Sequence, residues 1–304
     1  MKCVKVVVSA LLIGLLLHHV DWKKLALEIG TLEVWKIAAA FLILAVQLPI
    51  STFKWQKALD VHELRLSFPF LQKVLCIAFF FNNFLPTSIG GDAYRVFRTL
   101  PKDGMKSRAL SAIVLERLLG LAALIAIGCL GGLLVLGQHE TTIVTYYLSA
   151  CTIGGAILAL LVVLLRKGLL HSLQERLGRI EKLKAFAQNF SYIKRGYREL
   201  LDIALVSLIF QVQAVLTIYL LFSAAGISIG MSECALIAAI SALVGILPIS
   251  INGIGVLEGS FVFVASELGV AFDQALLVAF LLRILVLPLS LICGVVYIIE
   301  PRAT

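Results

Sequence analysis

Residues 85–91 read LPTSIGG and residues 247–253 read LPISING, so five of seven positions are identical in two segments far apart in the chain. Each segment ends a short apolar stretch, at residues 74–85 and 234–247, with proline, serine and glycine. Apolar stretches of about 10 to 14 residues are more often re-entrant than membrane-spanning. We therefore predict two re-entrant hairpins, each interrupted at the same kind of turn.

Six further stretches approach or reach the roughly 20 apolar residues that a membrane span needs. They are residues 3–20, 34–53, 109–136, 142–165, 201–222 and 275–299. The chain of 304 residues is 61% apolar and 14% charged, whereas soluble domains have about 45–50% and about 25%. This composition excludes a water-soluble enzyme and a disordered chain. The predicted fold class is an all-α polytopic membrane protein with about six transmembrane helices.

The basic residues indicate the orientation of the chain, because Lys and Arg accumulate in cytoplasmic loops. If both short stretches enter and leave on one side, most of the 26 Lys and Arg residues fall in cytoplasmic loops, including residues 54–73, 95–108 and 166–198. If each short stretch instead crossed the membrane once, the basic clusters at 95–108 and 166–198 would face outward. We therefore predict that both termini are cytoplasmic. The net charge of +8 is explained in the same way, without a nucleic acid partner.

The two interrupted segments occupy corresponding places in a longer repeat within one membrane domain, residues 1–304. Spans also correspond before and after them, Lys36 with Leu201 and Ala109 with Ala275, which gives units at 34–136 and 201–299. Three crossings separate the hairpins, so the units have opposite orientations. Matching interruptions in two inverted units are typical of a transporter with a binding site near the midplane. The alternative is that Pro and Gly only kink the helices.

Arg117 and Arg283 coincide when Ala109 is aligned with Ala275, and each lies eight residues into its predicted span, about 12 Å deep. An arginine at that depth is costly and is rarely present without a role. Guanidinium groups present forked donors to phosphate oxygens, so the two residues are candidates for binding a lipid phosphate. The alternative is a structural ion pair. Its candidate partners are Glu116, Asp92 and Glu258.

The two turns are a second candidate anion site, because a half-helix that starts after each turn directs free N–H groups and a positive dipole inward. Glycine there lets a headgroup approach the backbone closely. Ordinary N-capping is the alternative. The candidate capping residues are Ser88, Asp92, Ser250 and Asn252.

Residues 166–200 place basic residues between apolar ones at spacings of three and four. This pattern predicts an amphipathic helix on the cytoplasmic leaflet, with a solvated loop as the alternative. The six cysteines include no CxxC pair and no histidine lies at metal spacing, so we expect no metal and no cofactor. No hydrolase triad, HExxH or Walker pattern occurs, and we do not expect an enzyme.

Four blocks occur in order along nearly the whole chain: FFFNNFLPTSIGGDAYR at 79–95, ERLLGL at 116–121, LPISINGIGVLEG at 247–259 and LLR at 281–283. In these blocks the chain resembles the flippase-like family named after the transmembrane region of lysylphosphatidylglycerol synthase. The resemblance implies movement of an amino-acylated or glycosylated lipid between the leaflets of a prokaryotic plasma membrane. Larger members append a soluble aminoacyl-transfer domain. No such domain follows here, so we do not expect the chain to synthesise the lipid.

We therefore expect a lipid translocator for a phospholipid or glycolipid with a phosphate-bearing headgroup. The alternative is a membrane-embedded enzyme or accessory subunit that acts on a polyprenyl or glycolipid phosphate, and a small-solute carrier is a third interpretation. Expected partners are membrane lipids, with a second copy of the chain or a lipid-synthesising enzyme as further candidates. The candidate substrate-binding residues, most of them implied by the resemblance, are Ser88, Gly90, Gly91, Asp92, Arg95, Glu116, Arg117, Ser250, Gly253, Gly255, Glu258 and Arg283.

Overall fold

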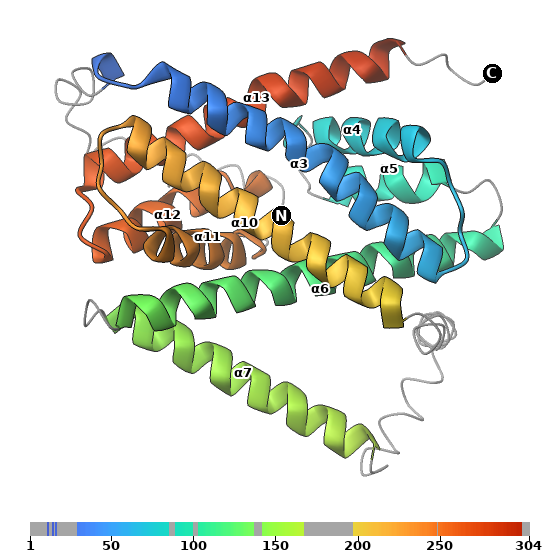
Figure 1. Cartoon of the computed structure of the whole chain (residues 1–304). Helices are drawn as coiled ribbons and strands as arrows, with labels where there is room; N and C mark the ends of the chain where they lie inside the picture. Colours follow the sequence, from blue (N-terminus) through green and yellow to red (C-terminus); the bar gives the residue numbers. More distant parts are fainter. Residues whose placement is uncertain are drawn as a thin grey trace.

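The computed structural model describes residues 29–84, 89–99, 103–136, 142–166, 197–247 and 249–299, together with residues 11, 14 and 16. Within these residues all regular structure is helical, with nine α-helices and one 3-10 turn (Figure 1). The α-helices are α3 (Val34–Val61), α4 (Phe68–Phe84), α5 (Ile89–Thr99), α6 (Asp103–Leu136), α7 (Thr142–Arg166), α10 (Tyr197–Ala224), α11 (Met231–Gly245), α12 (Val256–Glu267) and α13 (Phe272–Ile299). The prediction of an all-helical chain is confirmed for this part.

Four of the described helices are long and apolar enough to cross a membrane. They are Val34–Val61, Arg108–Leu136, Arg198–Ala224 and Phe272–Ile299, and each contains one of the predicted spans. The predicted span at 142–165 is the 25-residue helix α7. The predicted span at 3–20 and the amphipathic helix at 166–200 lie almost entirely outside the described residues. The chain is thus a multi-pass membrane protein.

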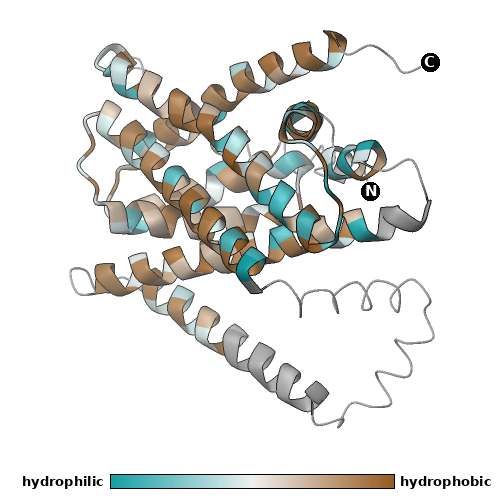
Figure 2. Cartoon of the chain, turned by 45° about the vertical axis from the view of Figure 1, so that its right-hand side comes forward, coloured by the Kyte–Doolittle hydropathy of each residue, from teal (hydrophilic) through white to brown (hydrophobic). Residues whose placement is uncertain are grey.

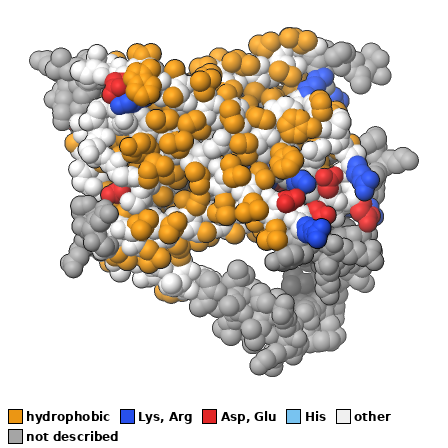
Figure 3. Space-filling view, viewed as in Figure 1, with side chains coloured by type: hydrophobic (Ala, Val, Ile, Leu, Met, Phe, Trp, Pro, Cys, Tyr) orange, Lys and Arg blue, Asp and Glu red, His pale blue; other side chains and the backbone are white. Residues whose placement is uncertain are grey.

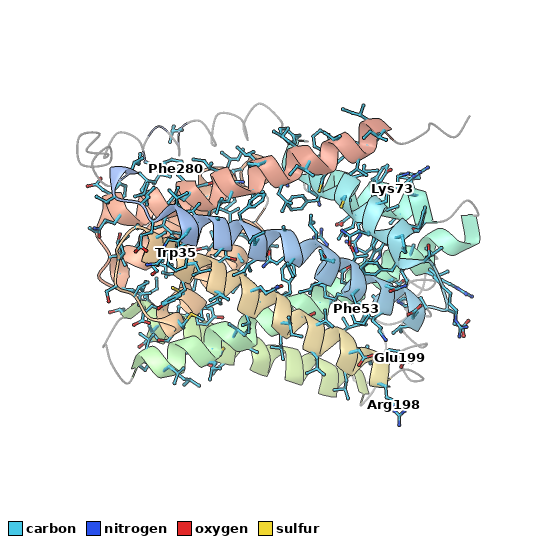
Figure 4. All side chains as sticks on the ribbon, turned by 45° about the horizontal axis from the view of Figure 1, so that its top comes forward. Trp35, Phe53, Lys73, Arg198, Glu199 and Phe280 are labelled. Atoms are coloured by element: carbon cyan, nitrogen blue, oxygen red, sulfur yellow. The ribbon has the colours of Figure 1, made fainter. Side chains whose placement is uncertain are left out.

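The outer surface has the character of a lipid-facing surface. Large apolar side chains are exposed along the long helices, for example Leu133 at 62% and Ile298 at 80%. Figure 2 shows mostly hydrophobic residues along the long helices, and Figure 3 shows apolar side chains over the middle of one face, with charged ones mainly toward its ends. Trp35 lies near one end of the bundle, and Arg198 and Glu199 lie at the other (Figure 4). Exposed apolar area on this scale is typical of contact with lipid.

The two shorter apolar helices, α4 and α11, contain most of the predicted hairpin stretches at 74–85 and 234–247. They have 17 and 15 residues, and each is followed by another short helix, α5 or α12. Residues 85–88, which contain the first interruption, lie outside the described part. The second interruption is the 3-10 turn Ile251–Gly253, where Asn252 and Gly253 have φ of 50° and 72°. A left-handed backbone is open to glycine and tolerated by asparagine, which explains the residues at this turn.

The helices pack in a crossed pattern. α3 and α10 lie side by side through the centre of the bundle, α4 packs against α13, and α11 packs against α6 (Figure 1). The α4–α5 pair lies at the end where α3 ends and α6 begins, whereas the α11–α12 pair lies where α10 ends and α13 begins. α7 packs on α6. A short helix from each half therefore contacts the last long helix of the other half.

Candidate functional site

The first candidate site joins the start of α5 to the middle of α6. Asp92 lies in the first turn of α5, where a carboxylate is favoured by the positive end of the helix dipole. Arg117 of α6 donates a hydrogen bond from Nη2 to Asp92 Oδ2. The side chain of Asp92 is 18% exposed, whereas that of Arg117 is 58% exposed. Arg117 is therefore the accessible member of this pair.

A buried network of charged side chains adjoins the Asp92–Arg117 pair. Arg95 donates from Nη2 to Glu116 Oε2, and its Nη1 lies 3.5 Å from Asp92 Oδ1. Lys54 Nζ of α3 lies 3.5 Å from Glu116 Oε1, and the Arg95 guanidinium carbon lies 4.2 Å from the centre of the Trp55 ring. A buried charge without a partner is strongly destabilising, so the four charged side chains depend on one another.

The second candidate site joins the start of α12 to α13. Arg283 donates from Nε to Glu258 Oε1 at 2.6 Å, and its Nη2 lies 2.5 Å from the same oxygen. Glu258 lies in the first turn of α12, and its Oε2 accepts a hydrogen bond of 2.7 Å from the backbone N–H of Gly255. This capping interaction satisfies a free N–H at the helix start and fixes the carboxylate toward α13.

The two ion pairs have the same relation to the chain. Each carboxylate lies in the first turn of a short helix, and each arginine follows it by 25 residues. The alignment that pairs Arg117 with Arg283 also pairs Asp92 with Glu258. Both arginines are thus paired with one of the carboxylates named from the sequence. The third, Glu116, pairs with Arg95 and Lys54 instead.

Each ion pair lines its own cavity. The Arg117 cavity has a volume of about 350 Å³ and lies between α3, α4, α5, α6, α10 and α13. Its polar lining consists of Gln47, Ser51, Asn82, Asp92, Arg95, Glu116 and Arg117. The Arg283 cavity has a volume of about 390 Å³, and its polar lining consists of Gln211, Ser241, Glu258 and Arg283. The remaining lining residues of both cavities are apolar.

The predicted glycine and serine positions have different surroundings. Ser88 lies outside the described residues, and Gly90 precedes Gly91 in the first turn of α5. The Gly91 N–H donates to Asn82 Oδ1 at 2.9 Å, and a Cβ there would overlap the Ala78 carbonyl oxygen, so this glycine lets α5 lie close on α4. Ser250 is buried at 6% exposure. Gly253 and Gly255 have φ of 72° and 84° in the turn before α12.

Two expectations about basic residues were wrong. Lys54 and Lys57 were expected in a cytoplasmic loop, but both lie inside α3, which continues to Val61 because no Gly or Pro follows the predicted span before that point. Lys54 is buried against Glu116. Arg95 was counted as a loop charge as well as a candidate site residue, and it is buried at 6% exposure. Trp55 and Phe210 also contact this network and were missed, because an aromatic residue in an apolar helix gives no signal of its own.

Residues 3–294 match the family model described as "Lysylphosphatidylglycerol synthase TM region". The chain belongs to this family. No curated protein matches the chain. Membership in the lysylphosphatidylglycerol synthase TM region family indicates a membrane protein that acts on lipids, and the resemblance noted in the four sequence blocks is confirmed. In the described part of the chain no group of three or more His, Cys, Asp or Glu side chains is placed to hold a metal ion.

Proposed function

We propose that this protein translocates a lipid with a phosphate-bearing headgroup between the two leaflets, and that it carries out no covalent chemistry. The observation that carries the proposal is the presence of two cavities, each with one guanidinium–carboxylate pair on its wall. A translocator must offer its headgroup a polar site on each side of the bilayer centre, because a charge is costly in lipid. A pair of equivalent sites meets this requirement.

An inverted-topology repeat, with α4–α5 and α11–α12 as re-entrant hairpins, explains why the pairs are equivalent. The hairpins lie at opposite ends of the bundle, and equivalent helices exchange partners, α4 with α13 and α11 with α6 (Figure 1). The end of α4 also meets the second turn, because the Asn252 side-chain amide donates to the Asn83 carbonyl oxygen at 3.4 Å. These relations support units at 34–136 and 201–299 that face each other across the membrane.

Arg117 is the residue most suited to bind the phosphate first. It lines its cavity, most of its side chain is accessible, and its planar fork can offer donors beyond the one that Asp92 accepts. Arg95 is held by Glu116, Asp92 and Trp55, so we assign it a positioning role for these carboxylates. Arg283 is 25% exposed and provides the corresponding donor in the second cavity.

The proposed setting is the inner membrane of a prokaryote, with both termini cytoplasmic. The Arg198 and Glu199 end of the bundle then faces the cytoplasm (Figure 4). In this orientation the Arg117 cavity belongs to the hairpin that enters from the cytoplasmic side. A second copy of the chain or a lipid-synthesising enzyme is the proposed protein partner.

One observation favours the alternative, a membrane-embedded enzyme or accessory subunit that acts on a lipid phosphate. The two cavities differ in their number of charged side chains, because the positions equivalent to Arg95 and Glu116 are Phe261 and Leu282, which line the Arg283 cavity. An enzyme needs its larger set of charged side chains on one side only. A translocator also tolerates this difference if one cavity receives the headgroup more strongly than the other.

Reconstitution of the purified full chain tests the proposal. Vesicles of phosphatidylcholine and phosphatidylglycerol would contain NBD-labelled phosphatidylglycerol, and dithionite would quench the outer leaflet. A passive bilayer leaves about half of the signal protected. We expect protein-containing vesicles to lose clearly more than that half, and we expect Arg117→Ala and Arg283→Ala to remove most of the excess.

The control variant is Arg198→Ala, which removes an exposed arginine near the start of α10. Equal quenching by the wild type and by both cavity variants would refute the roles of Arg117 and Arg283. Transfer of label from a soluble radiolabelled aminoacyl or nucleotide-sugar donor to lipid in the same vesicles would favour the enzyme instead.

A further inference from the structure

The two cavities share an apolar wall. Among the described residues only Phe210 of α10 and Val286 of α13 line both cavities. The two residues therefore stand between the Asp92–Arg117 pair and the Glu258–Arg283 pair. A headgroup that passes from one pair to the other must pass this wall.

The segment of α10 that carries Phe210 is held by polar contacts with the two neighbouring helices α3 and α6. The Gln47 side-chain amide of α3 donates to the Phe210 carbonyl oxygen at 3.4 Å, and the Gln211 side-chain amide donates to the Gly120 carbonyl oxygen of α6 at 3.2 Å. These hydrogen bonds tie α10 to both neighbouring helices. The backbone of this part of α10 is therefore held in place, and the Phe210 ring can change position only by rotation about its side-chain torsions.

The ring is also held by a charge from the first site. Lys54 Nζ lies 5.0 Å from the centre of the Phe210 ring, within the range of a cation–π interaction, and the same ammonium group lies 3.5 Å from Glu116. The position of the ring between the two cavities is thus linked to the buried charged network beside the Arg117 cavity.

We propose that Phe210, with Val286 opposite, is the gate between the two headgroup cavities and sets the largest headgroup that crosses. This proposal rests on the proposed lipid translocation. It adds Phe210, an uncharged residue outside both ion pairs, as a residue that determines specificity. An apolar gate keeps the cavities from joining into one polar channel, which would let water and ions leak across the bilayer. Its opening is the step at which headgroup size matters most.

The first experiment tests the wall without any transport. The full chain with its six native cysteines replaced by alanine receives either Ser51→Cys in the Arg117 cavity or Ser241→Cys in the Arg283 cavity. A charged, membrane-impermeant methanethiosulfonate is added to one side of sealed vesicles. The wall predicts that the side that labels Ser51→Cys labels Ser241→Cys poorly. Phe210→Ala should raise the second labelling rate by about tenfold, the effect of a lower barrier to passage.

The second experiment measures selectivity for headgroup size. NBD-labelled phosphatidic acid, phosphatidylglycerol and phosphatidylinositol share a phosphate and differ in headgroup size. We expect Phe210→Ala to raise the rate for phosphatidylinositol relative to phosphatidylglycerol by about tenfold and Phe210→Trp to lower it. Phe263→Ala removes a phenylalanine of α12 that is 59% exposed and lines neither cavity, so it should leave the ratio unchanged.

Val286→Ala is the smaller change on the other side of the wall, and it keeps the test decisive if Phe210→Ala does not fold. If neither variant changes thiol labelling or the ratio of rates, the gate is disproved. If thiol labelling changes as expected but the wild type moves none of the three lipids, the wall stands as a structural feature, and lipid translocation and the gating role both fail.

Discussion

Gly294 of α13 lies so close to Phe80 of α4 that a Cβ atom on the glycine would stand 2.7 Å from two carbons of the ring. Gly128 of α6, the equivalent residue of the first half, is in the same position relative to α11, where a Cβ would overlap the Ala239 side chain. Small residues let helices approach in lipid, where packing provides much of the stability. Glycine therefore stands at both of these contacts, α13 with α4 and α6 with α11.

Replacing Gly294 by leucine should destabilise the fold by separating α13 from α4. The Phe80 ring already fills the space that the new side chain would need. Overpacking of this kind costs about 1–3 kcal/mol. The measurement is the unfolding midpoint of the purified protein in detergent. Gly154→Leu on α7 is the matched control, since nothing lies within 4 Å of a Cβ there, and a loss of equal size in the control would contradict the packing argument.

The ion pair of the second site should behave as a coupled unit. Glu258→Gln keeps an acceptor for the Gly255 N–H but leaves the Arg283 charge without its carboxylate, at an expected cost of about 2 kcal/mol. Adding Arg283→Gln should recover part of this loss, with a coupling energy of about 0.5–3 kcal/mol. Denaturation of the two single variants and the double variant measures it. Additive losses would show that the pair contributes no coupling.

Arg95 and Arg117 should have different effects although both contact Asp92. Arg95→Ala leaves Glu116 buried with only Lys54 as a partner, so we expect a loss of stability of about 3 kcal/mol. Arg117 is 58% exposed, so Arg117→Ala should change stability by less than about 1 kcal/mol while it reduces lipid translocation.

Stability and translocation rate measured on the same preparations separate these two roles. Arg95→Lys should restore part of the translocation by a folded Arg95 variant, since a positioning charge is retained. If a stable Arg95→Ala protein lost translocation and Arg95→Lys restored none of it, Arg95 would instead be placed in direct contact with the lipid.

The spans and the paired arginines could be predicted because each has a recognisable pattern in the sequence. Length and hydropathy define α6, α10 and α13, and the alignment of the two halves relates Arg117 to Arg283. The partner of each arginine could not be chosen from spacing alone, because Glu116 is adjacent in sequence to Arg117 yet contacts Arg95. Consecutive residues on a helix point in different directions, so contact depends on which neighbouring helix each one faces.

The wall at Phe210 could not be predicted at all. Its role depends on two cavities that form only when the helices of both halves pack, and an apolar residue in an apolar helix has no distinguishing neighbours in the sequence. Lys54 was misplaced for a related reason, since a basic residue after about 20 apolar ones usually marks the end of a span. Its buried partner, Glu116, belongs to a different helix far along the chain.

Two native thiol pairs allow the relative motion of the halves to be tested. The thiols of Cys76 in α4 and Cys293 in α13 lie in contact across the two halves, and those of Cys129 in α6 and Cys151 in α7 lie in contact next to one half only. If translocation requires the halves to move against each other, a disulfide between Cys76 and Cys293 should stop it. The second disulfide should have little effect.

Each pair is tested in a variant that retains only its own two cysteines. Copper phenanthroline with oxygen is the oxidant, which takes two electrons and two protons from the thiols, and dithiothreitol should reverse the effect. The NBD–dithionite assay gives the rate, and a thiol count with Ellman's reagent gives the extent of oxidation. Full translocation by a protein whose Cys76 and Cys293 are fully oxidised would mean that α4 and α13 stay together throughout the cycle. The headgroup would then pass Phe210 through motion of side chains alone. Rotation of the Phe210 ring is the least motion that the proposed gate requires.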